Sequence, residues 1–172
     1  MDKDRELTGV TDLLKHLDGW SIVIQGESPD FVLENYSSKE RVGVEVTEYY
    51  PNRTKKGCAI VRIKGKDSEE SDSNKYRFFE KTELGYSRLV PSIDVDDFQS
   101  KCLTEKEKKL PLYRTNARSC KEFWLLVMLS FYDNIVYENI SSISTLFDKV
   151  YIWEEPGIVY SMPIDNSNAL LI

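Results

Sequence analysis

Apolar and polar positions in the first fifty residues follow two different periods, which predict one helix and then three strands. Over residues 4–18 the apolar positions recur at helical spacing, and Asp18-Gly19 ends the pattern. Beyond it, short runs rich in apolar or β-branched residues predict strands, and the polar turn before the third strand predicts a hairpin. These three strands are expected at residues 20–24, 31–33 and 41–49.

The second half of the chain predicts a charged helical segment followed by further strands. A helical pattern extends over residues 93–118, with Asp94 as its N-cap and Pro111 as the point where a helix bends or ends. The run 123–131 is apolar throughout, which fits a parallel strand or a buried helix, and we favour a strand. The remaining expected elements are a short helix at 141–147 and strands at 149–153 and 157–164.

Residues 51–92 show no clear period. The run 59–63 is consistent with either a strand or a turn of helix. Residues 65–74 are acidic, rich in serine and free of apolar side chains, so we expect a mobile loop there. No internal repeat is visible in the sequence.

Length and charge limit the class of protein. A chain of 172 residues with 41% hydrophobic residues is long enough for one well-packed domain, which we expect over residues 1–172. A net charge of −6 argues against a wholly basic nucleic-acid coat protein but is compatible with a local basic patch. The apolar runs are too short to cross a bilayer, and the first residues lack the apolar core of a signal peptide. We therefore expect a cytoplasmic protein with no membrane partner.

The three cysteines and one histidine further limit the kinds of metal site and catalysis that the chain can have. The cysteines are odd in number and far apart, which argues against a disulfide framework or a structural zinc site and favours a reducing compartment. His16 falls on the polar side of the first predicted helix, as is typical of a solvated side chain, and no nucleophile motif accompanies it. Any catalysis therefore has to come from carboxylates, lysines and a metal ion.

The third predicted strand carries the most informative residues. Because side chains alternate along a strand, Gly43, Glu45 and Thr47 share one face, while the valines between them share the other and need a helix to cover them. If the hairpin pairs as expected, Asp30 at the start of the second strand lies beside Glu45. Two carboxylates, completed by the peptide carbonyl of Val46, form the oxygen ligand set that Mg²⁺ or Mn²⁺ prefers. Such a metal ion polarises a phosphodiester and activates water.

This order of features resembles the PD-(D/E)xK nuclease superfamily, which has the restriction-endonuclease-like fold. The residues that carry the resemblance are Pro29, Asp30, Glu45 and position 47. The resemblance implies an α/β fold with an α-β-β-β-α-β core, in which a central mixed sheet is flanked by helices. It also implies a nuclease that depends on Mg²⁺ (or Mn²⁺), cleaves phosphodiester bonds of nucleic acid and holds the metal ion with Asp30 and Glu45.

The chain departs from the family at one of these positions. Family members usually have a lysine where this chain has Thr47, and threonine cannot supply positive charge to the attacking water or the transition state. Some members take the lysine from the following helix, for which Lys106 is the first candidate and Lys109 the second. Some members also carry an extra acidic metal ligand on the first helix, which here would be Glu6 or Asp12.

The predicted helical segment is strongly basic. Between Gln99 and Lys121 there are seven lysines and arginines and two glutamates, which gives this segment a charge of +5 and leaves −11 for the rest of the chain. A basic helix beside an acidic metal site suits a phosphate backbone, although a solvated helix face has the same composition. The candidate nucleic-acid contacts are Lys101, Lys108, Arg114 and Arg118, with Lys55 and Lys56 beyond the third strand.

Two other interpretations stay open. Without the motif lysine, the chain could be an inactivated nuclease fold that binds a protein partner, such as a defence accessory, a counter-defence factor or an immunity-type protein. It could also have a different fold, in which Asp30 and Glu45 lie more than about 10 Å apart and cannot share one cation. The sequence does not distinguish DNA from RNA as the target, nor a monomer from a dimer.

Overall fold

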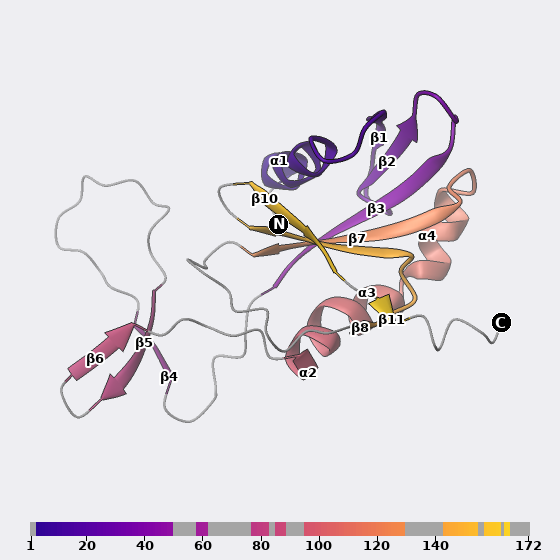
Figure 1. Cartoon of the computed structure of the whole chain (residues 1–172). Coiled ribbons are helices and arrows are strands. Elements are labelled where there is room, and N and C mark those ends of the chain that lie inside the picture. Colours follow the sequence, from indigo (N-terminus) through magenta and orange to yellow (C-terminus); the bar gives the residue numbers. More distant parts are fainter. Residues whose placement is uncertain are drawn as a thin grey trace.

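The chain has an α/β fold in which helices cover both faces of a mixed six-stranded sheet (Figure 1). Helix α1 (Lys3–Leu14) packs on one face, and a broken helical segment from α2 to α4 packs on the other. The computed structural model describes residues 3–49, 58–61, 77–82, 85–88, 95–129, 143–154, 157–162 and 164–165.

Parallel strands form the centre of the main sheet, and antiparallel strands extend both sides. In spatial order the strands are β1 (Trp20–Gln25), β2 (Phe31–Asn35), β3 (Arg41–Glu48), β7 (Glu122–Leu129), β9 (Lys149–Glu154) and β10 (Ile158–Ser161). β3, β7 and β9 run parallel, whereas β1–β2, β2–β3 and β9–β10 are antiparallel pairs. The predicted hairpin and the predicted apolar strand in the second half of the chain are therefore confirmed.

Two smaller sheets accompany the main one. An antiparallel sheet contains β4 (Cys58–Val61), β5 (Arg77–Thr82) and β6 (Gly85–Arg88), so the ambiguous run near residue 60 is a strand. A short parallel pair joins β8 (Ile143–Ser144) to β11 (Ile164–Asp165). The loop predicted at 65–74 lies outside the described residues.

The valine face of β3 is buried against α1, as the alternation predicts. Val42, Val44 and Val46 are at most 3% exposed and belong to one apolar cluster with Val10 and Leu13 of the helix. Because these valines fill one face of the strand, the residues between them must point to the opposite face of the sheet. The same packing therefore fixes the direction of Glu45.

The helical segment on the opposite face is broken into short pieces. It consists of α2 (Val95–Phe98), a π-helical stretch at Gln99–Thr104, α3 (Glu105–Glu107) and α4 (Leu110–Asn116). The break after α3 precedes Pro111, which lies in the first turn of α4. Backbone N–H groups in the first turn make no intrahelical hydrogen bond, so the N–H that proline lacks is not needed there. The prediction of a helical segment that is interrupted near Pro111 is confirmed over 95–116, whereas the expected N-cap Asp94 lies outside the described residues.

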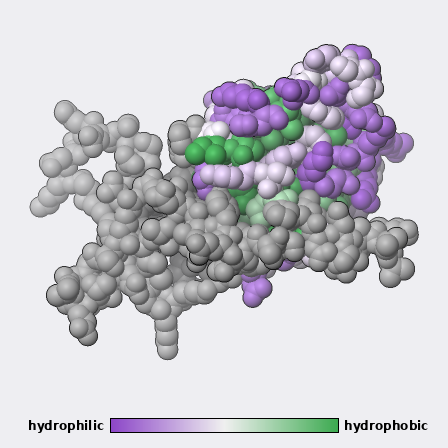
Figure 2. All heavy atoms as spheres, viewed as in Figure 1, coloured by the Kyte–Doolittle hydropathy of each residue, from purple (hydrophilic) through white to green (hydrophobic). Residues whose placement is uncertain are grey.

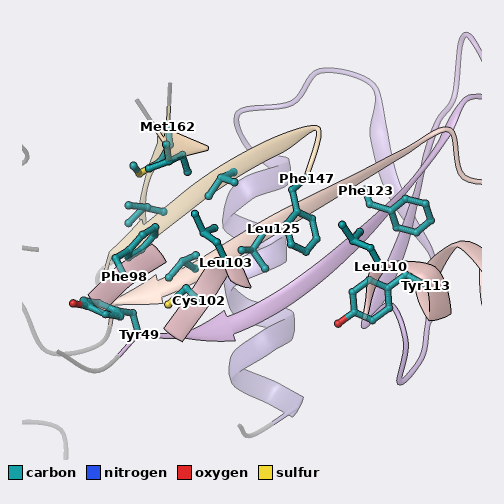
Figure 3. Packing of buried hydrophobic residues seen from close by; sticks show 14 of the residues in the cluster. Tyr49, Phe98, Cys102, Leu103, Leu110, Tyr113, Phe123, Leu125, Phe147 and Met162 are labelled. Carbon is teal, nitrogen blue, oxygen red and sulfur yellow. The ribbon is translucent and has the colours of Figure 1, made fainter. Parts of the chain in front are cut away.

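Aromatic and aliphatic side chains of this segment pack on the sheet (Figure 3). Phe98 meets Tyr49 edge to face with ring centroids 5.3 Å apart, and Tyr113 stacks on Phe123 with centroids 6.5 Å apart. Figure 3 shows Tyr113 and Phe123 together at one end of this layer, with Leu110 beside them. The segment is thereby held at a fixed position over β3 and β7.

The helix predicted at 141–147 is wrong for the residues that the structure describes. Ile143 and Ser144 form β8, and the chain then bends. Glu107 Oε1 accepts hydrogen bonds from Thr145 Oγ1 at 2.6 Å and from the Leu146 N–H at 2.9 Å. This long-range contact holds residues 145 and 146 in a non-helical conformation, although the local sequence pattern predicts a helix there.

The last predicted strand is shorter than expected. β10 ends at Ser161, and strand pairing resumes only at β11. The turn before β10 contains Gly157 with φ +122°, and a Cβ there would lie 2.8 Å from Asp12 Oδ2. The β9–β10 turn therefore depends on a glycine that packs against α1.

On the face shown in Figure 2, the residues that the structure describes are largely hydrophilic, and a small hydrophobic area lies at β10. Ile158 in this strand is 49% exposed, and Tyr160 is 39% exposed. No helix among the described residues is long and apolar enough to span a membrane.

Candidate functional site

The β2–β3 hairpin brings Asp30 and Glu45 to neighbouring positions. Phe31 pairs with Val44 in antiparallel register, so the next step of the same register sets Asp30 opposite Glu45. Directly opposite residues of such a pair have Cβ atoms about 4.5–5.5 Å apart. The expectation that the two carboxylates lie side by side is consistent with this register and with contacts that both groups make near the backbone of Val46: Asp30 bonds to its N–H, and Lys106, the partner of Glu45, bonds to its carbonyl.

The backbone N–H and C=O of Val46 make separate contacts with the site. Asp30 Oδ2 accepts a hydrogen bond from the Val46 N–H at 2.8 Å. Lys106 Nζ donates to Glu45 Oε1 at 2.6 Å and lies 3.2 Å from the Val46 carbonyl oxygen. Lys106 thus reaches from α3 to β3 and contacts two of the three groups that we expected to hold a metal ion.

Gly43 makes room for this arrangement. A Cβ at position 43 would lie 2.7 Å from ring atoms of Phe123 and 3.0 Å from Cγ of Pro29. The ring of Phe123 can therefore pack against β3 only because residue 43 has no side chain. Pro29 is held at the same point, one residue before Asp30.

Both carboxylates are buried, and their charges interact. Asp30 is 8% exposed and Glu45 is 4% exposed. Burial raises the pKa of Glu45, and the charge of Asp30 raises it further, while the hydrogen bond and the charge of Lys106 oppose the change. The site therefore concentrates negative charge in a place where water does not fully solvate it.

A second lysine, Lys3 of α1, approaches Asp30 from the other side. Its Nζ lies 3.7 Å from Asp30 Oδ1, 3.4 Å from Glu6 Oε2 and 3.6 Å from Glu27 Oε1, and it donates to the Gly26 carbonyl at 3.2 Å. Burial alone would lower the pKa of Lys3, but the three carboxylates raise it. Glu6, proposed from the sequence as an extra acidic ligand, is thus linked to Asp30 through Lys3.

Three buried oxygen atoms of this region have no hydrogen-bond partner. Among the described residues, the buried side-chain nitrogen and oxygen atoms in this condition are Glu6 Oε2, Glu45 Oε2 and Tyr113 Oη. Glu45 and Tyr113 belong to the site and to the helix that covers it, whereas Glu6 is on α1, where its Oε2 lies 3.4 Å from Lys3 Nζ. Unpartnered buried polar atoms are rare and costly, so each of these atoms calls for an explanation.

The structure separates the remaining sequence candidates into near and distant residues. Asp12 is distant, because its carboxylate accepts a hydrogen bond from Trp153 Nε1 at 2.8 Å and pairs with Lys15 at 2.6 Å. Lys109 is exposed at the start of α4. Thr47 is half-buried two residues beyond Glu45. Of the two lysine candidates, the structure brings Lys106 to Glu45.

The candidate nucleic-acid contacts differ in their pairing. Lys108 forms an ion pair with Glu105 at 2.5 Å. Arg114 and Arg118 are exposed and form no ion pair with any residue that the structure describes. Lys101 is exposed and has a partner. Lys55 and Lys56 lie outside the described residues.

Two residues of the site, Lys3 and Tyr113, were not among the sequence candidates. Lys3 lies three residues before Glu6 on α1, so the helical spacing could have placed both on one face. Tyr113 had no such signal, because it joins this region only through the packing of α4 on the sheet.

The described residues offer a divalent cation only a small number of protein ligands. No group of three or more His, Cys, Asp and Glu side chains in the described parts of the chain is arranged to hold a metal ion. Asp30, Glu45 and the Val46 carbonyl nevertheless form an oxygen-only set, and Mg²⁺ is commonly bound by one or two carboxylates together with substrate phosphates.

Comparison of the chain with protein-family models, with curated proteins and with solved structures found no match.

Proposed function

We propose that this chain is a metal-dependent nuclease of the PD-(D/E)xK type that hydrolyses phosphodiester bonds in nucleic acid. The observation that carries the proposal is that Asp30 and Lys106 both bond to the backbone of Val46 while Lys106 also pairs with Glu45. The proposal includes the restriction-endonuclease-like core, which is consistent with the α/β architecture and the mixed sheet. Asp30, Glu45 and the Val46 carbonyl would hold Mg²⁺ or Mn²⁺, which supplies activated water and polarises the phosphate.

Lys106 would take the role of the lysine that is absent at position 47. Its ammonium group lies on Glu45 Oε1, and its side chain is only 19% exposed. A buried cation at this point stabilises negative charge that develops on a phosphate next to Glu45. Its attachment to α3 rather than to β3 accounts for the presence of threonine two residues after Glu45.

The outer surface of α4 would bind the nucleic-acid backbone. Three basic side chains on this helix and its ends, Lys109, Arg114 and Arg118, are exposed and have no ion pair within the described parts of the chain. Asn116 on the same helix donates to the Ser28 carbonyl at 3.1 Å, which ties α4 to the turn that carries Asp30. These positive charges therefore lie on an element attached directly to the carboxylate site.

A cleavage assay tests the proposal. Wild type should cut single-stranded or duplex DNA or RNA only when Mg²⁺ or Mn²⁺ is present. Asp30→Asn, Glu45→Gln and Lys106→Met should each lower the rate by at least about 100-fold, as is usual for loss of a group that stabilises transition-state charge.

Glu34→Gln is the matched control. Glu34 lies in the same hairpin but pairs with Arg41 at 2.8 Å, away from the site. Its rate should match wild type. Cleavage by Asp30→Asn and Glu45→Gln at the wild-type rate would refute the proposal.

A second candidate function is that of a binding module without catalysis. It is favoured by the positions of Lys106 and Lys3, whose ammonium groups already lie on oxygens that a cation would use. In this case the chain would bind a protein partner through a nuclease-like scaffold. Absence of both cleavage and thermal stabilisation by Mg²⁺ or Mn²⁺ would support this candidate over the first.

A further inference from the structure

Two of the unpartnered buried oxygens, Tyr113 Oη and Glu45 Oε2, belong to side chains on the same face of the sheet. The Tyr113 ring stacks on Phe123, and Phe123 is the β7 register partner of Gly43. Glu45 follows Gly43 by two residues and therefore projects from the same face. Figure 3 shows the Tyr113 ring beside Phe123 at this end of the core.

The two oxygens have complementary chemistry. Glu45 Oε1 already accepts from Lys106 at 2.6 Å, which leaves Oε2 as an acceptor without a donor. Tyr113 is 1% exposed, so water does not compete for its hydroxyl. A phenol hydroxyl can rotate to donate, and an ionised carboxylate can only accept.

We propose that Tyr113 is a positioning residue whose hydroxyl donates to Glu45 Oε2. With Lys106 on the other oxygen, this bond fixes the plane of the carboxylate and keeps Oε1 on the Lys106 ammonium group, which also contacts the Val46 carbonyl. Tyr113 itself touches neither a cation nor a phosphate. The inference rests on the proposed function, because it assigns Tyr113 to the same site.

Tyrosine NMR tests the contact without any metal ion. In protein labelled with ¹³C at Cζ of tyrosine, the Tyr113 resonance is the one that disappears in Tyr113→Phe. It should move in Glu45→Gln and stay unchanged in Glu34→Gln. An unchanged Tyr113 resonance in Glu45→Gln would overturn the proposal, and this comparison does not require Tyr113→Phe to be as stable as wild type.

Mn²⁺ binding tests the positioning role. Loss of a group that orients a metal ligand typically lowers metal affinity about 10- to 100-fold, and we expect that range for Tyr113→Phe. Tyr36→Phe is the control, because Tyr36 is 69% exposed. Paramagnetic resonance of free Mn²⁺ gives the dissociation constant of each variant.

The outcomes separate this inference from the proposed function. If Glu45→Gln abolishes Mn²⁺ binding while Tyr113→Phe binds as tightly as wild type, the positioning role is refuted. If wild type itself binds no Mn²⁺, the metal-dependent function fails instead, and the NMR comparison alone then decides the contact between Tyr113 and Glu45.

Discussion

At the scale of single residues, Glu45 combines opposing electrostatic effects. Burial and the neighbouring Asp30 favour its neutral form, whereas Lys106 favours its charged form. The balance raises its pKa, so the folded protein binds a proton at this residue more tightly than the unfolded chain does. The divalent cation that we propose would add a further positive charge beside this carboxylate.

The raised pKa predicts how stability depends on pH. The stability that Glu45 contributes is complete below the unfolded-state pKa of 4.5 and is lost as pH rises through the higher folded-state pKa. In the Glu45→Gln variant the amide that replaces the carboxyl group has no proton to lose. The free energy of unfolding of this variant should therefore increase relative to wild type as pH rises above 4.5, measured by urea denaturation in metal-free buffer.

Glu40→Gln is a control for which the opposite dependence of stability on pH is expected. The hydrogen bond and charge of Lys121 lower the pKa of Glu40, so its contribution is present at neutral pH and is lost on acidification. This variant should lose stability relative to wild type as pH rises. The same trend in both variants would contradict the assignment of a raised pKa to Glu45.

Gly43 allows a steric prediction at the same scale. Gly43→Ala forces a methyl group against Phe123 and Pro29, and overpacking of this kind costs about 1–3 kcal/mol in free energy of unfolding. Gly26→Ala is the comparison, because its Cβ would meet its nearest atom, the Pro29 carbonyl oxygen, at 3.3 Å. Chemical denaturation should show the larger loss for Gly43→Ala, and equal stability of the two variants would show that Gly43 is not needed for this close packing.

At the scale of elements, α4 connects the core, the carboxylate site and the surface. Its inner residues Leu110 and Tyr113 are buried, and Asn116 bonds to the turn before Asp30. Within the described part of the chain, its outer basic side chains form no ion pairs, whereas Lys108 and Lys121 nearby are paired with glutamates. The two kinds of basic side chain can therefore be compared within one short segment.

This difference predicts which charges control nucleic-acid affinity. Each phosphate contact contributes about 0.7–0.9 to the slope of log affinity against log salt. The double variant Arg114→Gln/Arg118→Gln should reduce that slope by about 1.4–1.8 in fluorescence anisotropy titrations. Lys108→Gln/Lys121→Gln, which removes paired charges, should change it much less, and equal effects of the two double variants would contradict a role for α4.

Much of this arrangement is visible in the sequence, and some of it is not. Strict alternation along β3 predicts the valine face and, with it, the direction of Glu45. Hairpin spacing predicts that Asp30 is its neighbour, and Lys106 is suggested by the resemblance to nucleases that take the lysine from the following helix. Tyr113 and the contact of Glu107 with Thr145 arise from tertiary packing, which leaves no local period. For the same reason the local pattern predicts a helix where β8 and its bend occur.

At the scale of the whole molecule, the site couples the helical segment to the sheet. Lys106 is the link, since its ammonium group bridges α3 to both Glu45 and the Val46 carbonyl. Removing one partner of a buried ion pair leaves an uncompensated charge. Global stability and cation binding are therefore expected to respond together to changes at Lys106.

Lys106→Met tests this coupling. Without a metal ion it should lower the free energy of unfolding by about 3 kcal/mol, because the Glu45 carboxylate loses its partner. Added Mn²⁺ should restore more stability to this variant than it adds to wild type, since the ammonium group no longer occupies the same oxygens. Calorimetry with and without Mn²⁺ measures both effects, and a loss that Mn²⁺ cannot offset would argue that Lys106 is purely structural.

A crystal structure after soaking with Mn²⁺ tests most directly whether Asp30 and Glu45 share a cation. The prediction is an anomalous difference peak about 2.0–2.6 Å from oxygens of Asp30, Glu45 and the Val46 carbonyl, with Lys106 Nζ displaced from Glu45 Oε1. No peak at this position at saturating Mn²⁺, with Lys106 still bonded to Glu45, would contradict a metal-dependent function.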